Sequence, residues 1–184
     1  MRAFALFTAT MFGISIPASA QSAVLTLGGP LSTLCYQSAL AADSRSSALE
    51  GCTRALDEEA LATPDRAATY VNRGIVLMSG GRLKEADADF DSALKLNQRL
   101  PDGWLNKGFL RLRTGNGREA LPLIQKGIDA GAANQALAIF ARGVAHEQMG
   151  ELGPAYADLK TAQRLAPGWS MPTEYLANYR VSQR

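Results

Sequence analysis

Histidine and cysteine are scarce in this sequence, which has one histidine, His146, and two cysteines, Cys35 and Cys52, among 184 residues. Zinc sites of the usual kinds need a cluster of cysteine and histidine ligands. A nucleophilic triad needs a base, which is most often histidine. His146 falls in a helical pattern, where packing explains a lone histidine better than catalysis does. We therefore expect no metal site, no catalytic residue and no enzyme activity.

A basic excess is also missing. The chain has 19 Lys and Arg against 17 Asp and Glu, which gives a formal net charge of +2. Nucleic-acid binding draws its affinity from basic side chains that neutralise phosphates, so no nucleic-acid partner is expected. The 47% of hydrophobic residues and the mixture of charge signs argue equally against a disordered chain.

The one long apolar run, Ala3–Ile16, is too short to cross a membrane. A helix of about 14 residues reaches roughly 21 Å, whereas the hydrocarbon core is about 30 Å thick. The run follows Arg2 and precedes a small-residue triplet, residues 18–20, which together form the pattern of a cleaved secretory signal. Residues 1–20 are therefore predicted to be a signal peptide. The mature chain is predicted to be exported, periplasmic or secreted, without stable membrane insertion.

What the sequence does have is an internal repeat. The stretch "YVNRGIVLMSGGRLKEADADFDSALKL" is followed by "WLNKGFLRLRTGNGREALPLIQKGIDA" and then by "IFARGVAHEQMGELGPAYADLKTAQRLAP". Gly74, Gly108 and Gly143 recur at nearly equal intervals, the second interval being longer by a single inserted residue. Self-similarity held at one period over three copies predicts a stack of repeated units.

The second of these stretches contains "GNGREA", residues 115–120, which fits the G-x-G-x-x-A pattern of a phosphate-binding loop. Such a loop needs a strand before it, inside a βαβ unit. Here a helical pattern precedes it, and the sister copies have "SGG" and "MGE" at the same place. Residues 115–117 are therefore predicted to form a turn between two helices, and no cofactor is expected.

The copies share a small eighth residue, a turn glycine and a small twentieth residue, with large residues at the fourth and twenty-fourth positions. The small and turn positions are Gly74, Gly108 and Gly143; Gly81, Gly115 and Gly150; and Ala86, Ala120 and Ala155. This pattern resembles the tetratricopeptide repeat, a helix-turn-helix unit of about 34 residues. The resemblance implies an all-α solenoid of helical hairpins with a C-terminal capping helix. The implied segments are a flexible lead-in, 21–30; a degenerate first repeat, 31–66; three repeats, 67–100, 101–134 and 136–169; and a cap, 170–184, with its helix at Pro172–Ser182.

Two copies carry opposite charges at their seventh and twenty-third positions, so that both pairs have the same separation along the chain. These pairs are Arg73 with Asp89 and Arg142 with Asp158. We predict that each is an ion pair between the two helices of one repeat; the alternative is a set of solvated charges. The middle copy places Lys107 opposite Leu123, which would leave Lys107 facing solvent or a ligand.

Cys35 and Cys52 fall at the seventh and twenty-fourth positions of the degenerate first repeat, close to where the charged pairs are expected in its neighbours. In an exported protein, an even pair of cysteines predicts a disulfide. The alternative is a pair of buried thiols in a helix interface.

In the family that the repeats resemble, the first helices line a concave face, and ligand contacts come from positions two, five, six, nine, twelve and thirteen. Asn72 and Asn106 hold the sixth position in consecutive copies, and an asparagine side chain can both donate to and accept from an extended peptide backbone. The alternative is that the apolar stripe at these positions is core, covered by the lead-in or by the capping helix. Carried over residue by residue, the resemblance implies a peptide groove of Val71, Asn72, Ile75, Met78, Leu105, Asn106, Phe109, Leu112, Arg113, Phe140, Val144, Glu147 and Gln148.

The sequence thus predicts a non-catalytic module or scaffold that binds a protein or an extended peptide in the periplasm. The alternative function is a homo-oligomeric structural or assembly protein of the cell envelope. A clamp for a partner's C-terminal carboxylate is not expected. Family members of that type use a basic fifth and an asparagine ninth residue, where the first clear copy has Val71 and Ile75.

Overall fold

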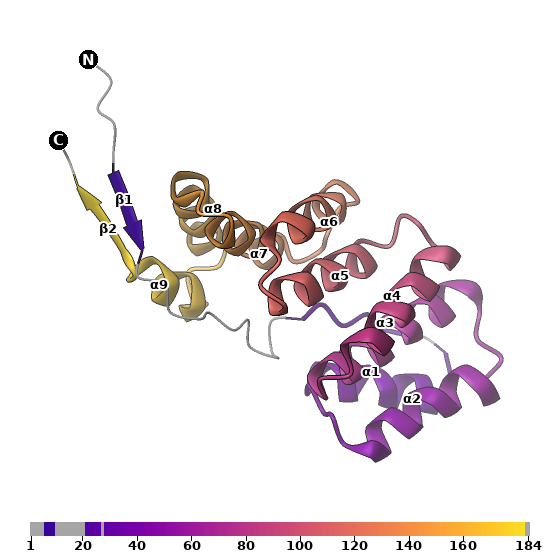
Figure 1. Cartoon of the computed structure of the whole chain (residues 1–184). Helices are drawn as coiled ribbons and strands as arrows, with labels where there is room; N and C mark the ends of the chain where they lie inside the picture. The colour runs from indigo at the N-terminus through magenta and orange to yellow at the C-terminus, as the bar shows by residue number, and fades with distance from the viewer. Residues whose placement is uncertain (1–5, 10–20, 27, 183–184) are drawn as a thin grey trace.

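The computed structural model describes residues 6–9, 21–26 and 28–182 (Figure 1). Within these residues the chain is a solenoid of helical hairpins, as predicted. The predicted signal peptide lies outside the described residues apart from positions 6–9. The described helices are α1 (Pro30–Leu40), α2 (Ser46–Glu58), α3 (Thr63–Ser79), α4 (Leu83–Leu96), α5 (Pro101–Arg113), α6 (Gly117–Asp129), α7 (Gln135–Gln148), α8 (Leu152–Leu165) and α9 (Ser170–Leu176).

The helices pair in chain order and the pairs stack. Each of the four hairpins packs its first helix against its second, and the first helices α1, α3, α5 and α7 also contact one another in sequence (Figure 1). We call the surface of α3, α5 and α7 that carries Asn72 and Asn106 the inner face. Because each hairpin shares its apolar surface with the next, one continuous core runs through the stack.

Glycine at two kinds of position makes the hairpins possible. The turn between α5 and α6 contains Gly115 with φ of 72°, a left-handed conformation in which a side chain is strained. Inside the hairpin, a Cβ atom on Gly108 would lie 2.5 Å from Cγ1 of Ile124, which is fully buried. The absence of a side chain at Gly108 therefore lets α5 and α6 approach closely.

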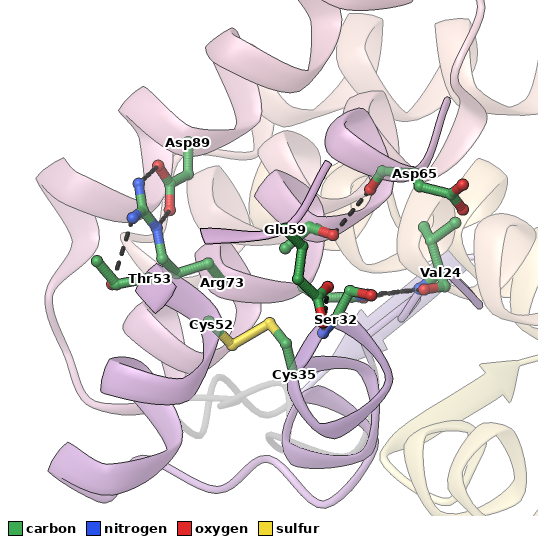
Figure 2. Close-up of a disulfide and its surroundings, with 11 residues drawn as sticks. Val24, Ser32, Cys35, Cys52, Thr53, Glu59, Asp65, Arg73 and Asp89 are labelled. Carbon is green, nitrogen blue, oxygen red and sulfur yellow. Dashed lines mark hydrogen bonds and ion pairs between the residues drawn. A yellow bond between two sulfur atoms is a disulfide. The ribbon is translucent and has the colours of Figure 1, made fainter. Parts of the chain in front are cut away.

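The first hairpin is joined covalently. Cys35 of α1 and Cys52 of α2 form the predicted disulfide, and both residues are fully buried (Figure 2). The turn between the two helices contains Ala42 with φ of 49°, where the other hairpins have a glycine with positive φ. The disulfide thus lies in the hairpin whose turn chemistry is the least favourable.

A carboxylate at the C-terminal end of α2 caps α1. Glu59 accepts hydrogen bonds from the backbone N–H groups of Leu31 (2.7 Å), Ser32 (3.1 Å) and Gly29 (3.2 Å), as Figure 2 shows in part. These N–H groups belong to the first turn of the helix and its N-cap, which have no intrahelical partners. Burial raises the pKa of Glu59, but the hydrogen bonds outweigh burial and hold this pKa below its ordinary value.

The C-terminal end differs from the prediction of one helix up to Ser182. Helix α9 ends at Leu176, and β2 (Tyr179–Ser182) follows it and pairs antiparallel with β1 (Leu6–Ala9). The segment "YRVS" has an aromatic and a β-branched residue in alternation, which favours a strand once a partner is present. Helix α9 does cover the last repeat, because the rings of Tyr175 and Phe140 pack edge to face with centroids 4.8 Å apart.

Candidate functional site: an asparagine ladder on the inner face

Two fully buried asparagines hold the backbone of the lead-in. The side chain of Asn72 accepts a hydrogen bond from the N–H of Val24 (2.9 Å) and donates one to the carbonyl of Val24 (2.7 Å). One repeat further on, Asn106 donates to the carbonyl of Ser22 (3.0 Å) and accepts from its N–H, the longest of these bonds at 3.4 Å. The two residues form a ladder, with one rung on α3 and one on α5.

The lead-in crosses this ladder as an extended chain (Figure 1). The N–H and the carbonyl of one residue point to the same side in extended backbone, and residues two apart then share a face. Residues 21–24 are all half-buried, and at the end of the segment Leu25 is 61% exposed while Thr26 is only 3% exposed. The sequence predicted a flexible lead-in, and its flexibility stays a prediction; in the structure the asparagines bond the backbone of Ser22 and Val24.

Side chains of the lead-in also contact the repeats. The hydroxyl of Ser22 donates to the carboxylate of Asp102, whose pKa is raised by burial against the opposing effect of this hydrogen bond. Ser79 donates to the side-chain carbonyl of Gln21 at 3.5 Å, a long contact. Val24 packs, half-buried, against the core. The backbone is therefore held at both rungs, and side chains of the lead-in pack against the core beside them.

The apolar members of the predicted groove do not form open pockets. Val71, Ile75, Met78, Leu105, Phe109, Leu112, Phe140 and Val144 are each 2% exposed or less. These side chains belong to the continuous core, and Phe140 is also packed against the rings of Trp169 and Tyr175. The stripe is core, the alternative that the sequence left open, and the polar rungs remain as the part of the inner face that binds backbone.

The remaining predicted groove residues lie at the C-terminal ends of α5 and α7. Arg113 is exposed, while Glu147 and Gln148 are half-buried. Gln148 donates to the carbonyl of Leu112 (2.9 Å) and so ties α7 to α5. Burial raises the pKa of Glu147. Glu147 and Gln148 are thus partly enclosed by the fold, whereas Arg113 is open to solvent.

Both predicted charge pairs join the helices of one hairpin. Arg73 contacts the two carboxylate oxygens of Asp89 at 2.7 and 2.8 Å, and Arg142 contacts those of Asp158 at 2.8 Å each. The hydrogen bond to the carboxylate raises the pKa of each arginine against the effect of burial. Figure 2 shows that Arg73 also reaches Thr53 of the preceding hairpin, at 3.3 Å. These pairs brace the solenoid and leave the ladder free.

Lys107 has a different partner from the one that its repeat position suggested. Instead of facing solvent or a ligand, it is only 9% exposed and contacts Asp87 at 3.0 Å and Asp91 at 2.6 Å. Both carboxylates come from α4, the second helix of the preceding repeat. The sequence contains a signal for this pairing, because Asp91 precedes Lys107 by the same interval that separates the two members of each predicted charge pair. That signal lies between repeats rather than within one.

Other kinds of site find little support in the part of the chain that the structure describes. No three His, Cys, Asp or Glu side chains there are grouped so that they could hold a metal ion. Among the helices described, none has the length and apolar character needed to cross a membrane. His146 pairs with Glu151 through Nδ1 at 2.6 Å.

Comparison with known proteins identifies the repeat. A tetratricopeptide-repeat family model matches residues 67–99, which form the α3–α4 hairpin. Two solved structures are similar in fold: the double mutant "MamA RS-1 ArsTM" at 24% identity, and MamA from residue 41 to the end, from Desulfovibrio magneticus RS-1, at 23%. Each gives a TM-score of 0.62 over 80% of this chain and 82% of the other. No curated protein matches the sequence.

The stacked hairpins define a helical-repeat protein with the fold of these two solved structures. The part of the chain that matches the tetratricopeptide-repeat family model is the α3–α4 hairpin. The fold supports a protein-interaction or scaffold module.

Proposed function

We propose that this chain is a non-catalytic scaffold of the periplasm which binds a protein partner through its inner face, after export and removal of residues 1–20. The partner offers an extended segment, and the asparagine ladder binds the backbone of that segment. The observation that carries the proposal is the pair of reciprocal contacts at Val24 and Ser22, where one asparagine satisfies both backbone groups of one residue.

This geometry suits a module that accepts more than one sequence. Hydrogen bonds to the backbone of the partner provide affinity without recognising its side chains. Specificity then depends on the few partner side chains that contact the inner face beside the ladder. The ladder is also preorganised, because Asn72 and Asn106 stand on adjacent packed helices. Preorganisation lowers the ordering cost of binding.

Site-specific photo-crosslinking in cells tests the proposal. A photoreactive amino acid at Arg113, the exposed member of the predicted groove, should capture a partner protein. The matched control is the same group at Lys95, which is exposed at the C-terminal end of α4, a second helix. The captured product should fractionate with the periplasm and should lack residues 1–20.

Three results would contradict parts of this proposal. Capture at Lys95 but not at Arg113 would place the partner on another surface. Crosslinks at Arg113 to a second copy of the same chain would favour the homo-oligomeric alternative. A cytosolic product that keeps residues 1–20 would refute the proposed location.

A further inference from the structure

We infer that residues 21–26 are a tethered ligand of the ladder, so that a partner must displace the chain's own lead-in before it binds. The inference rests on the proposed function and specifies the partner. The partner carries an extended segment like "SAVLT". This segment has a small polar residue at the Asn106 rung and, two places further on, an aliphatic residue at the Asn72 rung. Both residues must have a free N–H, which excludes proline at either position.

The contacts of the lead-in define this preference. At the Asn106 rung, Ser22 has a small side chain whose hydroxyl donates to Asp102. At the Asn72 rung, Val24 lies half-buried against the core. Ala23 also packs, half-buried, against the core, and Thr26 is buried, whereas Leu25 is 61% exposed. A partner segment is therefore selected at alternate positions, as expected for an extended chain on one surface.

The lead-in occupies the ladder. Asn72 and Asn106 are fully buried with the lead-in in place, and it bonds their amides, apart from one further bond from Asn106 to the carbonyl of Asp102. A polar group that is covered in this way is favourable only when it is hydrogen-bonded. The lead-in thus keeps the site satisfied while no partner is bound, and exchange of one backbone for another preserves the count of hydrogen bonds.

Displacement does not require the helices to unfold. The described lead-in residues have no strand partner, and within the described part of the chain the backbone at residues 22 and 24 is bonded through the two rungs alone. After removal of residues 1–20, the segment is attached at one end alone. Occupancy in cis weakens binding in trans by the inverse of the open fraction, so a site open about 1–10% of the time binds about 10–100-fold more weakly.

The test measures binding of a labelled peptide, QSAVLT, to the full mature chain and to two variants of the lead-in. Ser22→Pro/Val24→Pro removes both N–H donors to the ladder without touching a helix. Leu25→Pro is the matched control, because Leu25 is exposed and its N–H has no hydrogen-bond partner among the described residues. A second peptide carries N-methylvaline in place of valine and so lacks the donor for Asn72.

We expect the double-proline variant to bind QSAVLT at least about tenfold more tightly than the parent chain, as set by the open fraction. Leu25→Pro should behave like the parent, and the N-methylated peptide should lose binding to the opened variant. Fluorescence anisotropy gives the affinities. Circular dichroism of each variant confirms that the helices are intact.

The failures are distinguishable. Equal binding to the parent and the opened variant would overturn the tethered ligand while leaving the inner face as a segment-binding surface. No binding to the opened variant would overturn both the tethered ligand and the proposed mode of binding. Undiminished binding of the N-methylated peptide would place the segment away from Asn72 and would also overturn both.

Discussion

At the scale of single residues, the buried asparagines are the feature that packing alone does not explain. An asparagine side chain has two donors and an acceptor, and burial is favourable only when these are bonded. Asn72 bonds both backbone groups of Val24, and Asn106 does the same for Ser22. Each amide thus holds one residue of an extended chain, and the repeat places a second amide where the next rung is needed.

Close approach at a glycine gives the first prediction at this scale. Gly108→Ala should lower the free energy of unfolding by about 1–3 kcal/mol, because the new Cβ would lie 2.5 Å from Ile124, a fully buried side chain. Chemical denaturation measures the change. Gly168→Ala is the control: nothing lies within 4 Å of the place that its Cβ would take, and a change within about 0.5 kcal/mol is expected. Equal effects of the two substitutions would contradict this account of the hairpin.

The carboxylate at the start of α1 predicts a dependence on pH. Glu59→Gln should destabilise the chain by about 1 kcal/mol at pH 7, as the loss of a helix cap does. The folded pKa of Glu59 lies below its ordinary value of 4.5, so its contribution is complete above that value and is lost as pH falls through the folded pKa. The difference in unfolding free energy between parent and variant should therefore shrink below pH 4.5. A difference that stays constant far into the acid range would refute the charged cap.

At the scale of elements, the hairpins are braced in different ways. Bidentate ion pairs join α3 to α4 and α7 to α8, whereas a disulfide joins α1 to α2. Between α4 and α5 the bracing runs from one repeat to the next, through Lys107 and through Arg111, which contacts Asp87 at 2.8 Å. These braces lie away from the rungs, so the ladder rests on helices that several interactions hold.

Removal of the disulfide should weaken the first hairpin. Because 17 residues separate Cys35 from Cys52, Cys35→Ala/Cys52→Ala should cost about 3 kcal/mol through the gain in freedom of the unfolded chain. For a chain of this length the melting temperature should fall by about 6–12 °C. Thermal unfolding followed by circular dichroism measures the shift. A reductant should destabilise the parent and leave the alanine variant unchanged; the same response in both would contradict the assignment.

At the scale of the whole molecule, the two ends of the chain meet. Strand β1, inside the predicted signal peptide, pairs with β2 beyond the capping helix (Figure 1). This is a two-stranded sheet, so β2 has one strand partner among the described residues. The pairing brings residue 6 opposite residue 182, at the end of the stack where α9 lies (Figure 1).

Removal of residues 1–20 should free the edge of β2. In the chain that keeps these residues, amide hydrogens of residues 179–182 should exchange slowly, because strand pairing protects backbone N–H groups. In the mature chain the same amides should exchange much faster, while those of α3 and α5 stay protected. Hydrogen exchange followed by mass spectrometry or NMR compares the two. Equal protection of residues 179–182 in both chains would show that β1 is not their partner.

The sequence by itself determined the repeating architecture, because small residues at fixed intervals let two helices meet and turn glycines reverse the chain. It also identified the cysteine pair, the equally spaced charges and the two asparagines, since each follows from a position within the repeat. These are local consequences of a period. Each repeat could be read against its neighbours without knowing what lay across the fold.

Only the tertiary structure decided which residues surround each of these positions. Lys107 pairs with Asp87 and Asp91 because neighbouring repeats pack α4 against α5, a relation that a within-repeat comparison does not contain. The apolar stripe is part of the continuous core, in which Phe140 packs against Trp169 and Tyr175 from the C-terminal segment. The end of α9 and the strand after it depend on a partner at the opposite end of the chain. The backbone of the lead-in meets two asparagines that are distant in sequence, a long-range match that no local pattern specifies.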